Sequence, residues 1–447
     1  MNAVVPEGRS LAVLERVTMR RVAWRLMPLL MLTFFCSYLD RVNVGMAALT
    51  MNKQLGFSNA VFGFGAGIFY LGYSFAEIPS NLILNAVGAR RWIARIMVSW
   101  GIVAGLTAFV WNDWSYYVIR VLLGLAEAGY FPGVVLYLTW WFPSAYRSRM
   151  LALFYSSTLL SNFIGPPIGG LLLQMDGILG LYGWQWLFLL EALPSVVMGV
   201  VTWFLLTDRP TDATWLAPEQ RTWLAERLAL ERAQQEAVRK FTLAEAFCNL
   251  KLWLLTVANF GNPLTIGGIV TFLPLIVRGL GVSTNMIGVV SAVPFLFALA
   301  ALNVWGWHSD RTGERTWHVA GAYLLCATGL AACTLIGTSH PVLTMAALVV
   351  AVSGLWSAIS TFWSLPTALL TGTAAAGGIA MVNGIGMLGG WVGPWIFGLV
   401  KDASGSDNRA LLCLALAPLF SAVTVIVAGH GLRPARVPAQ PQQGKRA

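Results

Sequence analysis

Twelve apolar segments dominate this 447-residue sequence, and each is long enough to cross the hydrocarbon core of a membrane, which is about 30 Å thick. Only 11% of the residues are charged, against about a quarter in soluble domains. A spanning segment of this kind is helical, because a helix satisfies its own backbone hydrogen bonds. We therefore predict an all-α, multi-pass membrane protein with spans near residues 22–48, 60–84, 93–112, 115–141, 148–174, 184–206, 251–278, 285–307, 316–337, 341–370, 374–400 and 409–429.

The net charge of +10 reflects where the basic residues lie along the chain. If the N-terminus is cytoplasmic, most of the 29 Lys and Arg residues fall in cytoplasmic segments. The opposite side holds only Lys53, Arg278, Lys401 and Arg409. This asymmetry follows the positive-inside rule, so we expect both termini in the cytoplasm. The basic residues therefore indicate membrane topology, and we expect no nucleic-acid partner.

One long polar interruption, residues 207–246, divides the chain into two sets of six spans. Its Leu and Ala spacing predicts a short amphipathic helix on the membrane surface. We predict an N-terminal six-helix bundle over 1–206, a cytoplasmic linker over 207–246 and a C-terminal six-helix bundle over 247–433. The tail, 434–447, is rich in Pro and Gln, which predicts disorder.

The first and the fourth predicted spans each carry two charged residues in their interior: Asp40 and Arg41 in the first, Arg120 and Glu127 in the fourth. A charge in the bilayer costs about 2.5–3.5 kcal/mol on insertion scales, which favours a functional role. At about 1.5 Å per residue, Arg41 and Arg120 lie at similar depths. Two such guanidiniums facing one cavity would clamp a carboxylate. The alternative is that Arg41 pairs with Asp40 as a static ion pair, and Arg120 pairs with Glu127.

The two acidic residues have a separate candidate role. An anion that binds the arginines can release a neighbouring carboxylate to take up a proton, which would couple the entry of both. Glu127 is our first candidate for the proton carrier and Asp40 is the second. Tyr38 precedes Arg41 by three residues, and Tyr73 lies on the second span, so both are candidates to line the cavity. Packing in the core is the alternative for each tyrosine.

The segment "GWHSDRTGER", 306–315, resembles the Gly-x-x-x-Asp-Arg-x-Gly-x-Arg loop of the major facilitator superfamily. The resemblance implies two related six-helix bundles that alternate in access around a midplane site. It also implies that Gly306 permits close helix approach and that Asp310 and Arg311 bridge to neighbouring helix ends. The gating residues would be Gly306, Asp310, Arg311 and Arg315. An N-terminal copy, "NLILNAVGARR", has Asn85 and Ala86 in place of Asp and Arg.

Three further segments, "YLDRVNVGMA", "LLGLAEAGYFPGVVLYLTWWFP" and "FWSLPTALL", resemble the anion:cation symporter family within that superfamily. The resemblance is strongest to the branch that transports tartrate, phthalate and hydroxyphenylacetate. Ser157 or Thr158 replaces a Gln that sugar-acid members carry on the fifth span, which disfavours a polyhydroxy sugar acid. The resemblance implies proton handling by Asp40 and Glu127. It implies substrate binding by Arg41, Arg120, Tyr38, Tyr73, Ser360, Trp363 and Asn383.

We therefore expect a monomeric symporter in a bacterial inner membrane that takes up a small organic carboxylate with protons. The substrate would be a tartrate-like dicarboxylate or an aromatic acid. A proton-driven exporter and a non-transporting sensor of the same fold are the alternatives. The four His residues show no ligand spacing, so we expect no metal, and no cofactor is implied. No set of nucleophile, base and orienting acid is recognisable, so we expect no enzyme activity. Membrane lipid, the anion and the proton are the expected partners.

Overall fold

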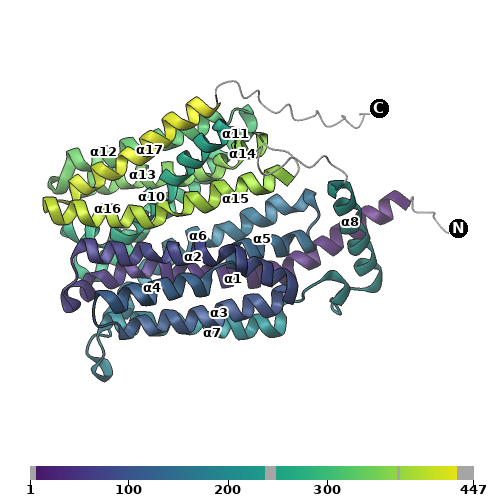
Figure 1. Cartoon of the computed structure of the whole chain (residues 1–447), viewed down its shortest axis with the longest axis horizontal. Coiled ribbons are helices and arrows are strands. Elements are labelled where there is room, and N and C mark those ends of the chain that lie inside the picture. Colours follow the sequence, from purple (N-terminus) through teal and green to yellow (C-terminus); the bar gives the residue numbers. More distant parts are fainter. Residues whose placement is uncertain (1–6, 237–247, 370–372, 430–447) are drawn as a thin grey trace.

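The computed structural model describes residues 7–236, 248–369 and 373–429, and within these ranges it contains helices and no strands. The all-α prediction is confirmed. The predicted disordered tail, 434–447, and the last part of the predicted linker, 237–246, lie outside the described residues. Figure 1 shows two groups of long helices, one stacked on the other.

The first group contains the helices up to residue 205. Its members are α1 (Glu7–Leu55), α2 (Asn59–Val87), α3 (Ala89–Leu106), α4 (Asp113–Glu127), α5 (Tyr130–Trp141), α6 (Ser144–Leu173) and α7 (Gly183–Leu205). The fourth predicted span, 115–141, is a single apolar run, but the helix breaks between α4 and α5. Gly129 has a φ of +83° there, and a Cβ atom would lie 2.3 Å from the Ser80 hydroxyl oxygen. Glycine is therefore required at this break.

The second group contains the helices after residue 249. Its members are α10 (Leu250–Gly279), α11 (Thr284–Thr312), α12 (Thr316–Ile336), α13 (Pro341–Phe362), α14 (Ser364–Leu369), α15 (Thr373–Met387), α16 (Gly389–Ser404) and α17 (Asp407–Gly429). The polar interruption carries α8 (Pro218–Glu236), and short 3₁₀ turns occur at Thr107–Phe109, Ile178–Gly180, Pro210–Asp212 and Gly337–Ser339.

All twelve predicted spans coincide with helices. Ten helical stretches among the described residues are long and apolar enough to cross a membrane. The predicted span 148–174 corresponds to α6, which has 30 residues but carries several Ser, Pro and Gly residues. The predicted span 374–400 is divided at Leu388 into α15 and α16, of 15 and 16 residues. Both depart from a continuous apolar helix at positions rich in small or polar residues.

Different segments of the chain lie at the two ends of the molecule. Helix α1 begins and α17 ends on the side where α8 lies, which we call the linker side (Figure 1). Helix α1 ends and α2 begins on the opposite side, which we call the far side.

The two groups touch closely near the far side. A Cβ atom added to Gly63 of α2 would lie 2.2 Å from the Pro394 carbonyl oxygen of α16, and one on Gly67 would lie 2.4 Å from that of Trp391. A Cβ on Gly288 of α11 would lie 2.2 Å from the Pro166 carbonyl oxygen of α6. Backbones that approach this closely exclude every side chain larger than hydrogen. The far side is therefore closed in this conformation.

Polar contacts reinforce this closure. The Asp402 carboxylate of α16 accepts hydrogen bonds from the first turn of α2, at 2.7 Å from the Asn59 side-chain amide and 2.7 Å from the Ala60 backbone N–H. Partial burial opposes ionisation, but these donors lower the pKa of Asp402 below its ordinary value. The contact is therefore fully present above the ordinary Asp pKa and is lost as the pH falls through the lowered one. Arg278 of α10 donates to the Leu49 carbonyl oxygen of α1 at 3.0 Å.

We predict that Gly67→Ala opens the far side. The added Cβ would meet backbone atoms of Trp391, and overpacking of this kind costs about 1–3 kcal/mol. Spin labels on Lys53 and Asn285, which are exposed at far-side helix ends in different groups, should report a larger population at long separation. Gly384→Ala is the matched control, because no atom lies within 4 Å of its added Cβ. An unchanged distance distribution in Gly67→Ala would contradict the steric account.

Candidate functional site

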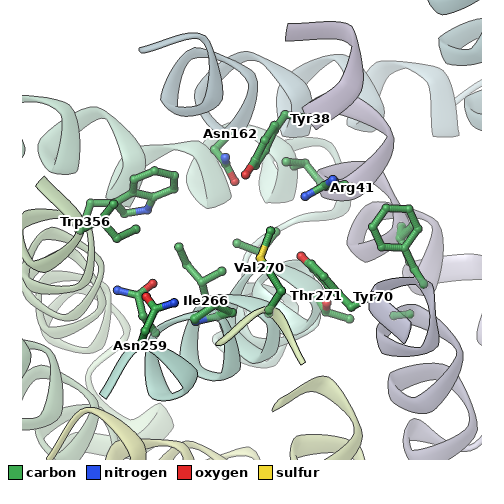
Figure 2. Close-up of a pocket in the computed structure, with 18 of the residues that line it drawn as sticks. Tyr38, Arg41, Tyr70, Asn162, Asn259, Ile266, Val270, Thr271 and Trp356 are labelled. Carbon is green, nitrogen blue, oxygen red and sulfur yellow. The ribbon is translucent and has the colours of Figure 1, made fainter. Parts of the chain in front are cut away.

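A cavity lies between the two groups of helices (Figure 2). Its empty volume, including the part open to solvent, is about 1080 Å³, which is sufficient for a small-molecule ligand. The first group lines it with Tyr38, Arg41, Phe69, Tyr70, Arg120, Tyr155 and Asn162. The second group lines it with Asn259, Asn262, Thr271, Trp356, Trp363 and Asn383. The lining therefore combines two guanidiniums with amides and aromatic rings.

Arg41 is held by a carboxylate of another helix. Its Nη2 lies 2.6 Å from Oε1 of Glu127 on α4, and Ser37 donates to the same oxygen at 2.8 Å. The side chain of Glu127 is 2% exposed and that of Arg41 13%, so only the arginine end of the pair reaches the cavity. The rings of Tyr38 and Tyr70 lie 5.0 and 5.7 Å from the guanidinium carbon. Cation–π contacts at these distances add to its stabilisation.

Arg120 is buried without a carboxylate partner within ion-pair distance among the described residues. Its Nη2 donates to the Ala66 carbonyl oxygen of α2 at 3.1 Å, and its Nε to that of Gly65 at 3.4 Å. Carbonyl dipoles orient the guanidinium but leave its charge uncompensated. Because Arg41 is neutralised by Glu127, Arg120 gives the cavity a net positive charge. Such a site attracts an anion.

The static ion pairs considered from the sequence are wrong. Arg41 pairs with Glu127 and not with Asp40, and Arg120 bonds to carbonyl oxygens. Asp40 does not line the cavity. It is 5% exposed and accepts a short hydrogen bond from Nε1 of Trp100 on α3, inside the first group. Adjacent residues of a helix point about 100° apart, so Arg41 and Asp40 face different neighbours.

The other candidates separate into two sets. Tyr38, Trp363 and Asn383, which are candidates for substrate binding, line the cavity. Tyr73 is 1% exposed and is not part of the lining, where Tyr70 stands one turn earlier. Ser360 is also outside the lining, and its hydroxyl donates to the Ser357 carbonyl oxygen at 2.8 Å.

Three asparagines of the cavity were missed by the sequence analysis. Asn162 of α6 donates to the Thr158 carbonyl oxygen at 2.8 Å, and its Oδ1 has no hydrogen-bond partner among the described residues. Asn259 and Asn262 of α10 each donate to a backbone carbonyl of the second group. Uncharged amides inside apolar spans were the available signal. An amide oxygen that is free to accept suits a ligand hydroxyl.

The predicted gating residues lie at the linker-side end of α11. Asp310 pairs with Arg315 at 2.6 Å, and Arg315 also donates to Ser309 at 3.0 Å. Arg311 lies over the Trp307 ring and forms no ion pair among the described residues, so the predicted bridge by Arg311 is absent in this conformation. A Cβ on Gly306 would meet only the Ser360 hydroxyl, at 3.7 Å, so the predicted close helix approach is absent there.

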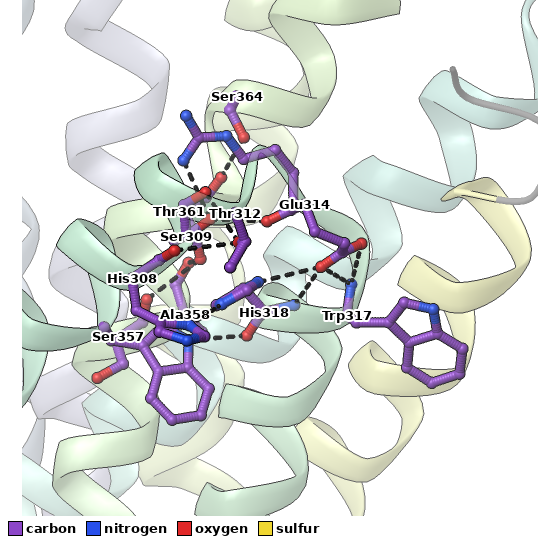
Figure 3. A network of polar contacts seen from close by, with 12 residues as sticks. His308, Ser309, Thr312, Glu314, Trp317, His318, Ser357, Ala358, Thr361 and Ser364 are labelled. Carbon is purple, nitrogen blue, oxygen red and sulfur yellow. Dashed lines mark hydrogen bonds and ion pairs between the residues drawn. The ribbon is translucent and has the colours of Figure 1, made fainter. Parts of the chain in front are cut away.

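A chain of polar contacts joins α11 to α12 beside these residues (Figure 3). His308 Nδ1 lies 2.7 Å from His318 Nε2, and His318 Nδ1 lies 3.0 Å from Glu314. Glu314 also accepts from the Trp317 backbone N–H at 2.9 Å, which caps the start of α12. Throughout the described ranges, no group of three or more His, Cys, Asp or Glu residues could hold a metal ion.

A family model described as the Major Facilitator Superfamily matches residues 30–394. A protein of Agrobacterium vitis named "Putative tartrate transporter" is 46% identical over 414 residues, which cover 93% of this chain and 92% of that protein. A protein of Acinetobacter baumannii named "Quinolone resistance transporter" is 37% identical, over 92% of this chain and 95% of that protein.

A solved structure supports the same fold. A bacterial homologue of the human lysosomal transporter Spinster, in an inward-facing and occupied conformation, superposes with a TM-score of 0.73. It covers 91% of this chain and 96% of its own, at 15% sequence identity. At this identity the likeness concerns the fold alone.

We predict that Trp100→Phe destabilises the protein by about 1–3 kcal/mol more than the loss of ring packing requires, because Asp40 loses a buried donor. Thermal unfolding of the purified protein measures the effect. Trp356→Phe is the matched control, since Trp356 is buried and its Nε1 has no hydrogen-bond partner among the described residues. Equal destabilisation of the two variants would contradict the assigned hydrogen bond.

We predict that Arg120→Lys weakens carboxylate binding roughly tenfold or more, because one ammonium cannot bond the α2 carbonyls and also present a planar fork to the ligand. Titration calorimetry with tartrate and phthalate measures the affinity. Arg95→Lys, on α3 and outside the cavity lining, should leave the affinity unchanged. Undiminished binding in Arg120→Lys would remove this residue from the site.

Proposed function

The chain belongs to the major facilitator superfamily, and we propose that it is a proton-coupled symporter that takes up a small organic carboxylate by alternating access. The single observation that carries the proposal is the pair of guanidiniums on one cavity, of which Arg120 has no carboxylate partner among the described residues. A carboxylate would receive hydrogen bonds from both and neutralise the uncompensated charge.

The size and lining of the cavity support a small acid. Tartrate is named for a relative that is 46% identical, and its hydroxyl groups suit the asparagine amides of the cavity. Trp356 and Trp363 line the same cavity and suit the ring of an aromatic acid. A dicarboxylate such as tartrate would occupy both arginines, whereas an aromatic monocarboxylate would occupy one and stack.

Proton coupling follows from competition for Arg41. Glu127 holds this guanidinium at 2.6 Å, so an incoming carboxylate must displace it. A displaced glutamate that is buried and 2% exposed is strongly disfavoured as an anion. A proton on Glu127 removes this cost and frees Arg41 for the substrate. Anion and proton therefore bind together, which is the condition for symport.

The close far-side contacts support a rocking mechanism. We propose that the bundles 1–206 and 247–433 move as units joined by the linker 207–246, and that the chain works as a monomer. The distribution of Lys and Arg supports a cytoplasmic linker side in a bacterial inner membrane. The closed far side then makes this conformation inward-facing. Asp310, Arg311 and Arg315 would act when the linker side closes.

A proton-driven exporter is the second candidate. It is supported by the relative named "Quinolone resistance transporter". An uncompensated guanidinium in the cavity suits an anion and repels a cation, so we rank export of a lipophilic cation below carboxylate uptake. A sensor of the same fold would keep the arginines but would not require proton binding at Glu127.

Uptake into proteoliposomes under an imposed inward proton gradient tests the proposal. Labelled tartrate would be competed with phthalate, hydroxyphenylacetate, galactonate and a lipophilic cation. We expect uptake that depends on the proton gradient and that is blocked by acids of one preferred class, either dicarboxylates or aromatic acids. Binding without uptake would support the sensor, and transport of the cation alone would support the exporter.

We predict that Glu127→Gln abolishes accumulation driven by the proton gradient but leaves exchange of labelled for unlabelled substrate at equal pH intact. The amide keeps a hydrogen-bond acceptor near Arg41 and cannot gain a proton. Glu77→Gln, a half-buried glutamate of α2 outside the cavity lining, is the control and should transport as the unmodified protein does. Accumulation against a gradient by Glu127→Gln would exclude Glu127 as the proton carrier.

A further inference from the structure

A second polar cluster lies behind the cavity, inside the first group of helices. It contains Asp40 and Asn43 of α1, which are three residues apart and share a helix face, and Glu191 of α7. All three are buried, at 5%, 0% and 4% exposure. None of them lines the cavity. The face of α1 that carries Arg41 meets α4 and the cavity, so α1 presents Arg41 and Asp40 to two separate environments.

Close backbone contacts position this cluster. A Cβ atom on Gly101 of α3 would lie 3.0 Å from the Val196 backbone nitrogen and 3.1 Å from the Ala192 carbonyl oxygen of α7. This contact sets Glu191 beside the turn of α3 that carries Trp100, the donor to Asp40. On the other side, a Cβ on Gly169 of α6 would lie 3.2 Å from the Asn43 Oδ1. The cluster is therefore enclosed by α1, α3, α6 and α7.

Glu191 faces Asn43 but has, within the described ranges, no cationic partner that would stabilise its anion. Neither of its carboxyl oxygens has a hydrogen-bond partner among the described residues, and the same holds for both polar atoms of the Asn43 side chain. In the part of the chain that the structure describes, no Lys, Arg or His lies within ion-pair distance of Glu191. The groups that face Glu191 are Asn43 and the like-charged Asp40. Burial and repulsion both disfavour ionisation.

The surroundings of Asp40 also fail to compensate two negative charges. The groups that face it are Trp100, Glu127, Arg120, Arg41 and, one turn earlier on α1, Cys36. Arg41 is already paired with Glu127, so only the single charge of Arg120 remains, which can offset at most one of two carboxylates. Two carboxyl groups that share one enclosed site do not both ionise. At least one proton therefore resides on this cluster in the far-side-closed conformation.

We propose that Glu191 and Asn43 form a further proton-binding site, separate from the proton handling expected of Glu127 and Asp40, which binds a proton in one access state and releases it in the other. The proposal rests on the proton-coupled function stated above. An O–H bond forms on a Glu191 oxygen with a proton taken from water, and the same bond breaks to return the proton to water on the other side. The new O–H donates to the Asn43 Oδ1, which satisfies two buried atoms that otherwise have no partner.

A proton suits this site better than a metal cation. The side chains around Asn43 that pack against α6 are those of Leu39, Met46 and Leu187, so oxygen ligands are few. Helices α1 and α7 belong to the same bundle, but α1 also contacts the second group through Gly45 and the Thr271 carbonyl oxygen. Rocking of the second group on α1 therefore changes the solvation of Asp40 and Asn43, which is how the site can differ between access states.

The number of protons moved per anion tests the proposal. In proteoliposomes with the membrane potential clamped at zero, Glu191→Gln should move one proton fewer per anion than the unmodified protein. The accumulation ratio at equilibrium then falls about tenfold for each unit of the pH gradient. Exchange at equal pH should persist. Glu191→Asp should keep the full proton count, and Ser195→Ala, one turn further along α7 and also buried, is the matched control with no change.

The outcomes separate this proposal from the proposed function. Unchanged proton stoichiometry in Glu191→Gln overturns the second site alone. Absence of proton-driven uptake in the unmodified protein overturns both proposals. Uptake that a sodium gradient drives and that Glu191→Gln abolishes would show that the site binds an alkali ion and not a proton. If Glu191→Gln does not fold, the infrared spectrum of Glu191→Asp is compared with that of the unmodified protein. A shift in the carbonyl band of a protonated carboxyl group supports the site, and an unchanged band overturns it.

Discussion

The ion pair between Arg41 and Glu127 is the interaction on which the rest of the structure depends. A charge buried in the membrane must be compensated, and here one carboxylate of α4 compensates one guanidinium of α1 at 2.6 Å. This pairing leaves Arg120 as the uncompensated charge of the cavity and turns Asp40 towards α3. The uncompensated charge of the cavity and the separation of Asp40 from it are both consequences of the same contact.

Contacts within the first group of helices stabilise it, whereas contacts between the two groups can break when the groups move. Glycine contacts between α3 and α7 hold the first group together and enclose its acidic residues. Glycine contacts between α2 and α16 and between α6 and α11 join the two groups towards the far side, where Asp402 caps α2. A cavity with charge at its centre and close packing at one end is the geometry that alternating access requires.

The sequence predicted the helices well, because length and apolarity decide whether a segment can cross a membrane. It also predicted Arg41 and Arg120 on one cavity, since rise per residue gives depth. Rise does not give the rotation of a helix about its own axis, so it could not show that Arg41 pairs with Glu127 or that Tyr73, unlike Tyr70, lies outside the cavity lining. Glu191 was missed although it carried the signal used for Asp40, a single carboxylate within a predicted span.

The exchange of Glu127 for substrate at Arg41 is the central claim, and proton uptake on binding tests it most directly. Titration calorimetry of the purified protein with the transported acid, repeated near neutral pH in buffers that differ in ionisation enthalpy, gives the number of protons taken up per anion. The account predicts a net uptake approaching one proton for each anion bound. Binding heats that do not depend on the buffer would contradict it.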